Sequence, residues 1–272
     1  MIRGLWTGVF LASTACGRSP STEASGDPAS APPDRAAGAK TQAGLVGAGT
    51  LTASGVLLGI IDDPPRVWLH SAAGDRSWVA PARIGALASG AKPAEVVVAA
   101  AWPEARVPSA EVWWLVEGVA QRHCSWKAPP AERWRAQPRG ASSVLALSDG
   151  AVVTGVDGSL VQFDASCRAT VLHAEGCCED ERPLRLRGDA RAWVAIDLGG
   201  QRVYPAGNAG GAAVCVPVLD GATVRGNGWR AQLPTEQRDV RVLDWSESCD
   251  AVLLAAGARA WVCRTSGCAR VR

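Results

Sequence analysis

Short apolar runs separated by turn residues constrain the fold of this 272-residue chain more than any other feature. From about residue 45 to the end, each run has the length of a strand, and Gly, Asp, Pro and Ser lie between the runs. Such a pattern is typical of β-strands. Asp149-Gly150 and Asp157-Gly158 favour tight hairpin turns. No segment has the apolar period of a helix of about twelve residues. We therefore predict a single all-β domain over residues 45–272.

The runs also group into larger units. Ser143–Val171 is interpreted as four strands joined by short turns, and comparable units cover residues 51–85, 92–130, 182–221 and 238–272. A spacing of about 40 residues with four short strands is typical of β-propeller blades. The body thus resembles, weakly, the repeats of bacterial β-propellers, and we expect about five or six blades. Leu45–Ala53 is expected to complete the last blade. A β-sandwich or a barrel is the alternative.

The first fifteen residues have the pattern of a secretory signal peptide. Arg3 precedes an apolar stretch, Gly4–Ala12, which is followed by the small residues Ser13, Thr14 and Ala15. The apolar stretch is shorter than the roughly 20 residues that a membrane-spanning helix needs. We therefore predict that residues 1–15 direct export.

Cys16 follows this small-residue run, and the combination resembles the lipobox of bacterial lipoproteins. In that family the cysteine thiol receives a diacylglycerol and becomes the mature N-terminus. Ser13 stands where the family usually has leucine, so cleavage by a non-lipid signal peptidase remains the alternative. The resemblance implies that Cys16 is the lipid-attachment site and that the protein is anchored in the cell envelope. Gly17 lacks the acidic retention signal known in enteric bacteria, which favours the outer membrane.

Residues 16–44 are expected to form a disordered tether behind the lipid. Between Gly17 and Gly44 there is no Val, Ile, Leu, Met or aromatic residue, so this segment cannot bury enough apolar surface to fold. A flexible chain of this length spans about 30 Å on average.

The cysteines other than Cys16 number eight, which allows four disulfides in an oxidising compartment. Cys263 and Cys268 flank a short turn, and we expect them to pair. Cys167 with Cys177 or Cys178 is the next pairing expected. No pair of Cys-x-x-Cys motifs indicates a zinc site, so we expect no metal.

Composition argues against several functions. The net charge is only +2 and no basic run occurs, which argues against nucleic acid as a partner. No nucleophile elbow, metalloprotease helix or phosphate loop is present, so we assign no catalytic residue and expect no cofactor. The acidic clusters Asp62-Asp63 and Glu179–Glu181 are interpreted as solvated loops.

Tryptophan is unusually frequent, with 12 Trp against 2 Phe and 1 Tyr. Trp113 and Trp114 are neighbours in a predicted strand and should point to opposite faces, so one of them could stack on a sugar ring. Alternatively, these indoles fill spaces between the sheets.

Together, these features lead us to expect an envelope-anchored, non-enzymatic binding or scaffolding lipoprotein. Its expected partners are the membrane, through Cys16, and an envelope protein or a glycan. A glycan-binding or glycan-cleaving module that uses exposed tryptophan is the alternative.

Overall fold

A computed structural model describes residues 44–92, 94–100, 109–127, 141–155, 158–173, 183–205, 215–234 and 239–272. All of them belong to one compact unit, Gln42–Arg272. The described residues form only strands and their connections, which confirms the all-β prediction. The predicted signal peptide, Cys16 and the tether up to residue 43 lie outside the described residues.

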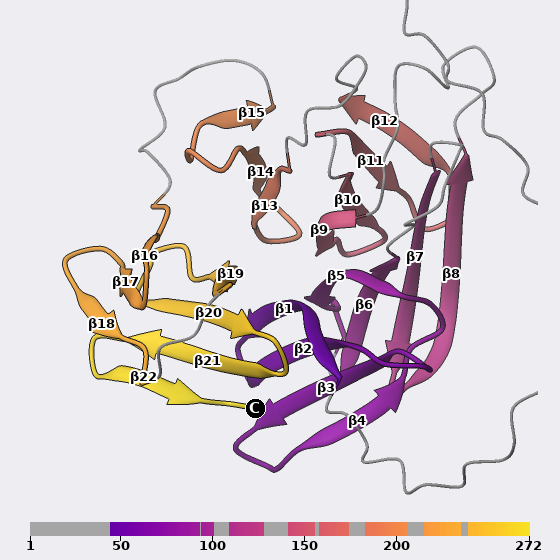
Figure 1. The fold of residues 1–272 in the computed structure, drawn as a ribbon. Helices are drawn as coiled ribbons and strands as arrows, with labels where there is room; N and C mark the ends of the chain where they lie inside the picture. Colours follow the sequence, from indigo (N-terminus) through magenta and orange to yellow (C-terminus); the bar gives the residue numbers. More distant parts are fainter. Residues whose placement is uncertain are drawn as a thin grey trace, which may run out of the picture. The chain divides into compact units, whose positions relative to one another are not determined.

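The described strands form six antiparallel sheets, in each of which every strand pairs with the next one along the chain (Figure 1). The first sheet has the strands β1 (Leu45–Thr52), β2 (Gly55–Ile61), β3 (Arg66–Ser71) and β4 (Arg76–Val79). The second has β5 (Ile84–Ser89), β6 (Glu95–Ala100), β7 (Ser109–Val116) and β8 (Val119–Lys127). The third has β9 (Ala141–Ala146), β10 (Ala151–Gly155), β11 (Leu160–Phe163) and β12 (Ala169–His173).

The next two sheets have three strands each. The fourth consists of β13 (Arg185–Gly188), β14 (Trp193–Ile196) and β15 (Arg202–Tyr204), and the fifth of β16 (Val218–Asp220), β17 (Thr223–Arg225) and β18 (Arg230–Gln232). The sixth has β19 (Arg241–Trp245), β20 (Ala251–Ala256), β21 (Arg259–Arg264) and β22 (Gly267–Arg270). Among the described strands, none of the sheets closes on itself, because each has two edge strands.

Local chemistry explains the hairpins of the third sheet. At the Asp149-Gly150 turn, the Leu147 amide donates to the Gly150 carbonyl at 2.9 Å, so β9 and β10 pair directly. At the turn after β11, the Asp164 carboxylate accepts bonds from the Ser166 and Arg168 amides at 2.9 and 2.8 Å. These turns place the four strands predicted within residues 143–171.

Neighbouring sheets share buried apolar clusters. The first sheet packs on the second, the second on the third, and the third on the fourth. One cluster joins the fourth, fifth and sixth sheets, and another joins the sixth sheet to the first. Because a sheet between two others is covered on both sides, its strands can be buried on both faces. The strand β20 is buried along its whole length. Apolar runs in this chain are therefore continuous where a sheet lies between two neighbours.

Two expectations about the strand units are corrected. The segment 182–221 was expected to form one unit, but it contains the fourth sheet and the first strand of the fifth. Leu45–Ala53 does not complete the last sheet, because β1 pairs with β2 along its whole length. Its backbone contact with the last sheet is the bond from the Val46 amide to the Gly257 carbonyl, at 2.9 Å.

Three disulfides join the described cysteines. One lies within a hairpin, and each of the other two joins segments of different sheets or the loops beside them. Cys263 and Cys268 face each other across β21 and β22 and are bonded. Cys215 is bonded to Cys249. Cys167 is bonded to Cys124 of β8, and not to Cys177 or Cys178 as expected, because the turn after β11 lies against the second sheet. Cys177 and Cys178 lie outside the described residues.

Candidate ligand-binding pocket

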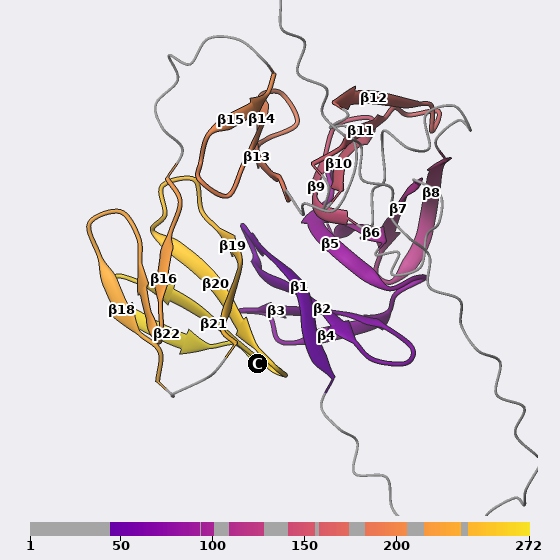
Figure 2. The same cartoon turned by 45° about the horizontal axis from the view of Figure 1, so that its top comes forward.

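The first strands of five sheets approach one another (Figures 1 and 2), and they line a pocket of about 810 Å³. Its lining comes from β1, β5, β9, β13 and β19 and from the residues that follow them. Small residues allow this approach: a Cβ added at Gly85 of β5 would lie 2.7 Å from the Ala141 carbonyl oxygen of β9. The pocket is thus built from residues that are far apart in the sequence.

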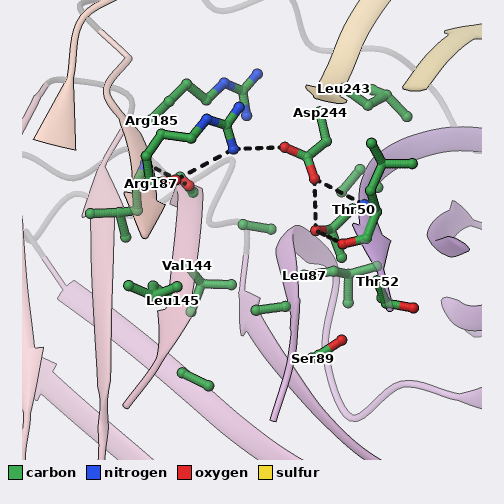
Figure 3. Close-up of a pocket in the computed structure, with 18 of the residues that line it drawn as sticks. Thr50, Thr52, Leu87, Ser89, Val144, Leu145, Arg185, Arg187, Leu243 and Asp244 are labelled. Carbon is green, nitrogen blue, oxygen red and sulfur yellow. Dashed lines mark hydrogen bonds and ion pairs between the residues drawn. The ribbon is translucent and has the colours of Figure 1, made fainter. Parts of the chain in front are cut away.

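Asp244 of β19 is the centre of a polar cluster in this pocket (Figure 3). Its Oδ1 accepts a hydrogen bond from Arg187 Nη1 at 2.8 Å. Its Oδ2 accepts bonds from the Thr50 hydroxyl and the Leu51 amide, both at 2.9 Å. The side chains of Asp244 and Arg187 are each only 13% exposed. The carboxylate therefore connects the sixth, fourth and first sheets through charge-assisted hydrogen bonds.

Arg185 and Arg187 alternate with Leu186 on β13. Residues two apart on a strand point to the same face, so both arginines line the pocket while Leu186 is buried between the third and fourth sheets. Arg185 Nη1 donates to the Ser142 carbonyl at 2.9 Å, and the Leu186 amide donates to the Ser143 hydroxyl at 3.2 Å. These bonds hold β13 against β9.

Burial changes the electrostatics of Arg185. Desolvation lowers the pKa of its guanidinium; the Asp244 carboxylate opposes this effect, and the neighbouring Arg187 charge adds to it. Arginine nevertheless stays charged in proteins. The described cluster thus contains two largely buried cations and one carboxylate.

Several donors of the cluster have no acceptor among the described residues. Arg187 Nε and Nη2 and Arg185 Nε are buried and make no hydrogen bond within the described part of the chain. The Arg187 guanidinium lies over the Trp245 ring, 3.9 Å from its centroid, which fixes its plane. Arg241, farther along the lining, donates to the Val46 carbonyl, and burial lowers the pKa of its guanidinium.

Trp113 and Trp114 offer no open aromatic face. They are 9% and 3% exposed and pack into the second sheet's two faces. Trp113 stacks on His123 with 4.4 Å between ring centroids, and Arg122 lies 3.5 Å from the Trp114 ring centroid. Each indole is thus covered by the residue opposite it on β8. Of the other described tryptophans, Trp245 and Trp261 are buried and five more are partly buried.

The remaining residues singled out in the sequence do not join this pocket. Cys263 and Cys268 form a hairpin disulfide in the last sheet. Asp62 and Asp63 follow β2 at the surface, and the acidic cluster 179–181 is not described. In the described ranges, no group of three His, Cys, Asp or Glu side chains is arranged to hold a metal ion. The same ranges contain no helix that is long and apolar enough to cross a membrane.

Sequence reasoning missed Arg185, Arg187 and Asp244. The pattern Arg-Leu-Arg contained a usable signal, because a strand with this pattern places two cations on one face and an apolar residue on the other. Asp244 carries no such signal, since its partners are distant in the sequence.

Comparison with known proteins identifies no family. No family model matches the chain, and no curated protein is similar to it. The solved structures that match include the computationally designed Ika8 protein, which is 14% identical and has a TM-score of 0.38. That match covers 78% of this chain and 81% of the designed one. A likeness at this TM-score decides neither fold nor function.

Proposed function

We propose that this protein is an exported, lipid-anchored binding or scaffolding protein of the bacterial envelope, and that its pocket is the binding site. The observation that carries the proposal is the pocket itself, which the first strands of five sheets line together. A pocket of about 810 Å³ is large enough for a small organic molecule.

The body is proposed to be a six-bladed β-propeller, with each sheet as one blade. In such a fold, consecutive blades pack face to face, the last blade packs on the first, and the first strands face the centre. The shared clusters have this order, including the one between the sixth and first sheets. In a propeller the first strands of the blades surround the central channel, and the first strands of five sheets line this pocket.

The anchor is proposed from the N-terminal sequence. Residues 1–15 would direct export, Cys16 would carry the lipid, and the tether up to residue 44 would hold the body off the membrane. Disulfides between sheets support an oxidising compartment outside the cytoplasm.

Binding is favoured because the polar groups of the pocket are held in place before any ligand arrives. Asp244 receives three hydrogen bonds, and Arg187 is stacked on Trp245. Polar groups fixed in this way recognise a ligand without loss of their own freedom. The glycan alternative has less support, because the aromatic faces on which it rested are covered.

The anchor is tested by fractionation of the full chain expressed in a Gram-negative bacterium. We expect the unchanged protein in the membrane fraction and Cys16→Ala in the soluble fraction. Ser13→Leu, which restores the residue usual in lipoprotein signals, is the matched control and should stay with the membrane. Membrane association of Cys16→Ala equal to that of the unchanged protein would contradict the anchor.

The pocket is tested with the same full chain. Ser89 is an exposed residue of the pocket lining, so Ser89→Trp should narrow the pocket without disturbing a core. Thr170→Trp on β12, also exposed and outside the pocket, is the control. Small molecules released from each purified protein are identified by mass spectrometry. A compound carried by the unchanged and control proteins but not by Ser89→Trp supports the proposal, and identical sets from all three refute it.

A further inference from the structure

We propose that the pocket binds a small molecule through an anionic oxygen group, a carboxylate or a phosphate, held by Arg185 and Arg187. The inference rests on the proposed function of the pocket and specifies the chemistry of its ligand. The step beyond the geometry is that the ligand provides the negative charge that the described cluster lacks.

The charges of the cluster are unequal. Arg185 and Arg187 contribute two positive charges, and Asp244 contributes one negative charge. Both oxygens of Asp244 are already occupied, Oδ1 by Arg187 and Oδ2 by the first sheet. Within the described residues, Arg185 therefore has a carbonyl as its acceptor but no carboxylate of its own. Because buried charges in proteins are normally paired, an anion is the expected complement.

The free donors also have the geometry of an anion site. Arg187 uses Nη1 for Asp244 and for the Leu186 carbonyl, and its Nε–Nη2 edge has no acceptor in the described part of the chain. This edge of a guanidinium donates two parallel hydrogen bonds and fits the two oxygens of a carboxylate or phosphate. Arg185 uses one of its five donors on a described residue, the bond from Nη1 to the Ser142 carbonyl. Buried donors without acceptors are rare in folded proteins, and a missing ligand is one explanation.

The Arg187 charge is also unfavourable for the charged form of Arg185. Desolvation lowers the pKa of Arg185 most, the Arg187 charge lowers it further, and the charge of a bound anion would oppose this lowering. The Trp245 ring and the Ser142 carbonyl hold the two side chains in this arrangement. Because the two side chains are already held in place, little freedom is lost when an anion binds.

The size of the pocket indicates that the anion is part of a larger molecule. Phosphate alone would fill a small part of about 810 Å³. The rest of the lining combines backbone with small and apolar side chains such as Leu87 and Val144, and it also contains three exposed charged residues, Asp189, Arg241 and Glu247. An organic acid or a phosphate ester with a larger organic body fits a pocket of this size.

The test is calorimetric titration of the full chain with sodium phosphate and, separately, with sodium citrate, against sodium chloride at equal ionic strength. We expect saturable binding of at least one of the two anions. Binding of phosphate alone would assign a phosphate ester, and binding of citrate alone would assign a carboxylic acid. Absence of saturable binding of both anions would overturn the inference.

Matched variants locate the site. Arg185→Gln should weaken binding about tenfold or more, the effect of one charge-assisted contact. Asp244→Asn should strengthen anion binding, because the variant removes the one negative charge of the cluster and leaves the two arginine charges without it. Arg225→Gln is the control, since Arg225 is 58% exposed, pairs with Asp220 and is not in the pocket lining. Equal affinities of the Arg185→Gln, Asp244→Asn and unchanged proteins would refute the site.

Failure of this inference can be distinguished from failure of the proposed function. A neutral compound that Ser89→Trp fails to retain, together with no anion binding, would keep the pocket as a binding site and reject the anion. Membrane association of Cys16→Ala equal to that of the unchanged protein would reject the anchor and leave the anion site untouched.

Discussion

The disulfide between Cys124 and Cys167 should stabilise the fold far more than the hairpin disulfide between Cys263 and Cys268. Cys124 is buried in β8 and Cys167 follows β11, so their bond connects the second and third sheets. The hairpin disulfide joins directly opposed residues of two strands that are already paired. The two bonds thus differ mainly in the length of chain that they close.

The magnitude follows from these lengths. A cross-link restricts the unfolded chain, and the stabilisation grows with the logarithm of the loop that it closes. The sequence separations are 43 and 5 residues. At 25 °C the chain-entropy relation then gives about 4 kcal/mol for Cys124–Cys167 and about 2 kcal/mol for Cys263–Cys268. The expected difference of about 2 kcal/mol exceeds the usual error of an unfolding experiment.

The assay is urea unfolding of the oxidised protein and of two double variants. Cys124→Ala with Cys167→Ala removes the long-range bond, and Cys263→Ala with Cys268→Ala removes the hairpin bond. Replacement of both partners leaves no new free thiol in either protein. The free energy of unfolding should fall about twice as far in the first variant. Equal losses, or a larger loss in the hairpin variant, would refute the entropic reasoning.

Three further predictions concern the core, the contact between sheets and acid stability. Phe163→Ala should lower the free energy of unfolding by about 3–5 kcal/mol, because Phe163 is fully buried between two sheets; a loss near zero in urea unfolding would contradict this burial. Gly85→Ala should lower the thermal midpoint, because its Cβ would lie 2.7 Å from the Ala141 carbonyl oxygen, and an unchanged midpoint would contradict that close approach. Hydrogen bonds hold the pKa of Asp164 below its ordinary value of 3.8, and the bond from the Ser166 hydroxyl has the largest effect. This group therefore contributes stability above that pH, which is lost as the pH falls through its folded pKa, and Asp164→Asn should flatten that part of the acid unfolding curve.

Much of the strand pattern was predictable because it depends on local chemistry. The four strands predicted within residues 143–171 coincide with apolar runs, and Asp-Gly pairs separate some of these runs. Both signals act within a few residues. The opposition of Cys263 and Cys268 across a short hairpin is local in the same sense. The two three-stranded sheets between residues 185 and 232 were less visible, because strands as short as Val218–Asp220 leave little periodicity to detect.

The N-terminal hypothesis is also a product of the sequence alone. The short apolar stretch, the small residues and Cys16 define a pattern that export machinery reads along the chain, without reference to a fold. Fractionation of the Cys16→Ala variant addresses it directly.

The positions of strands and turns follow from local sequence, because backbone preferences and side-chain alternation act between near neighbours. The choice of which strands meet belongs to the tertiary structure. It paired Cys167 with Cys124, covered the indoles of Trp113 and Trp114, and brought Arg187 to Asp244, 57 positions away. These contacts depend on the packing of whole sheets, which sums many weak apolar contacts over distant segments, and no short stretch of sequence contains that information.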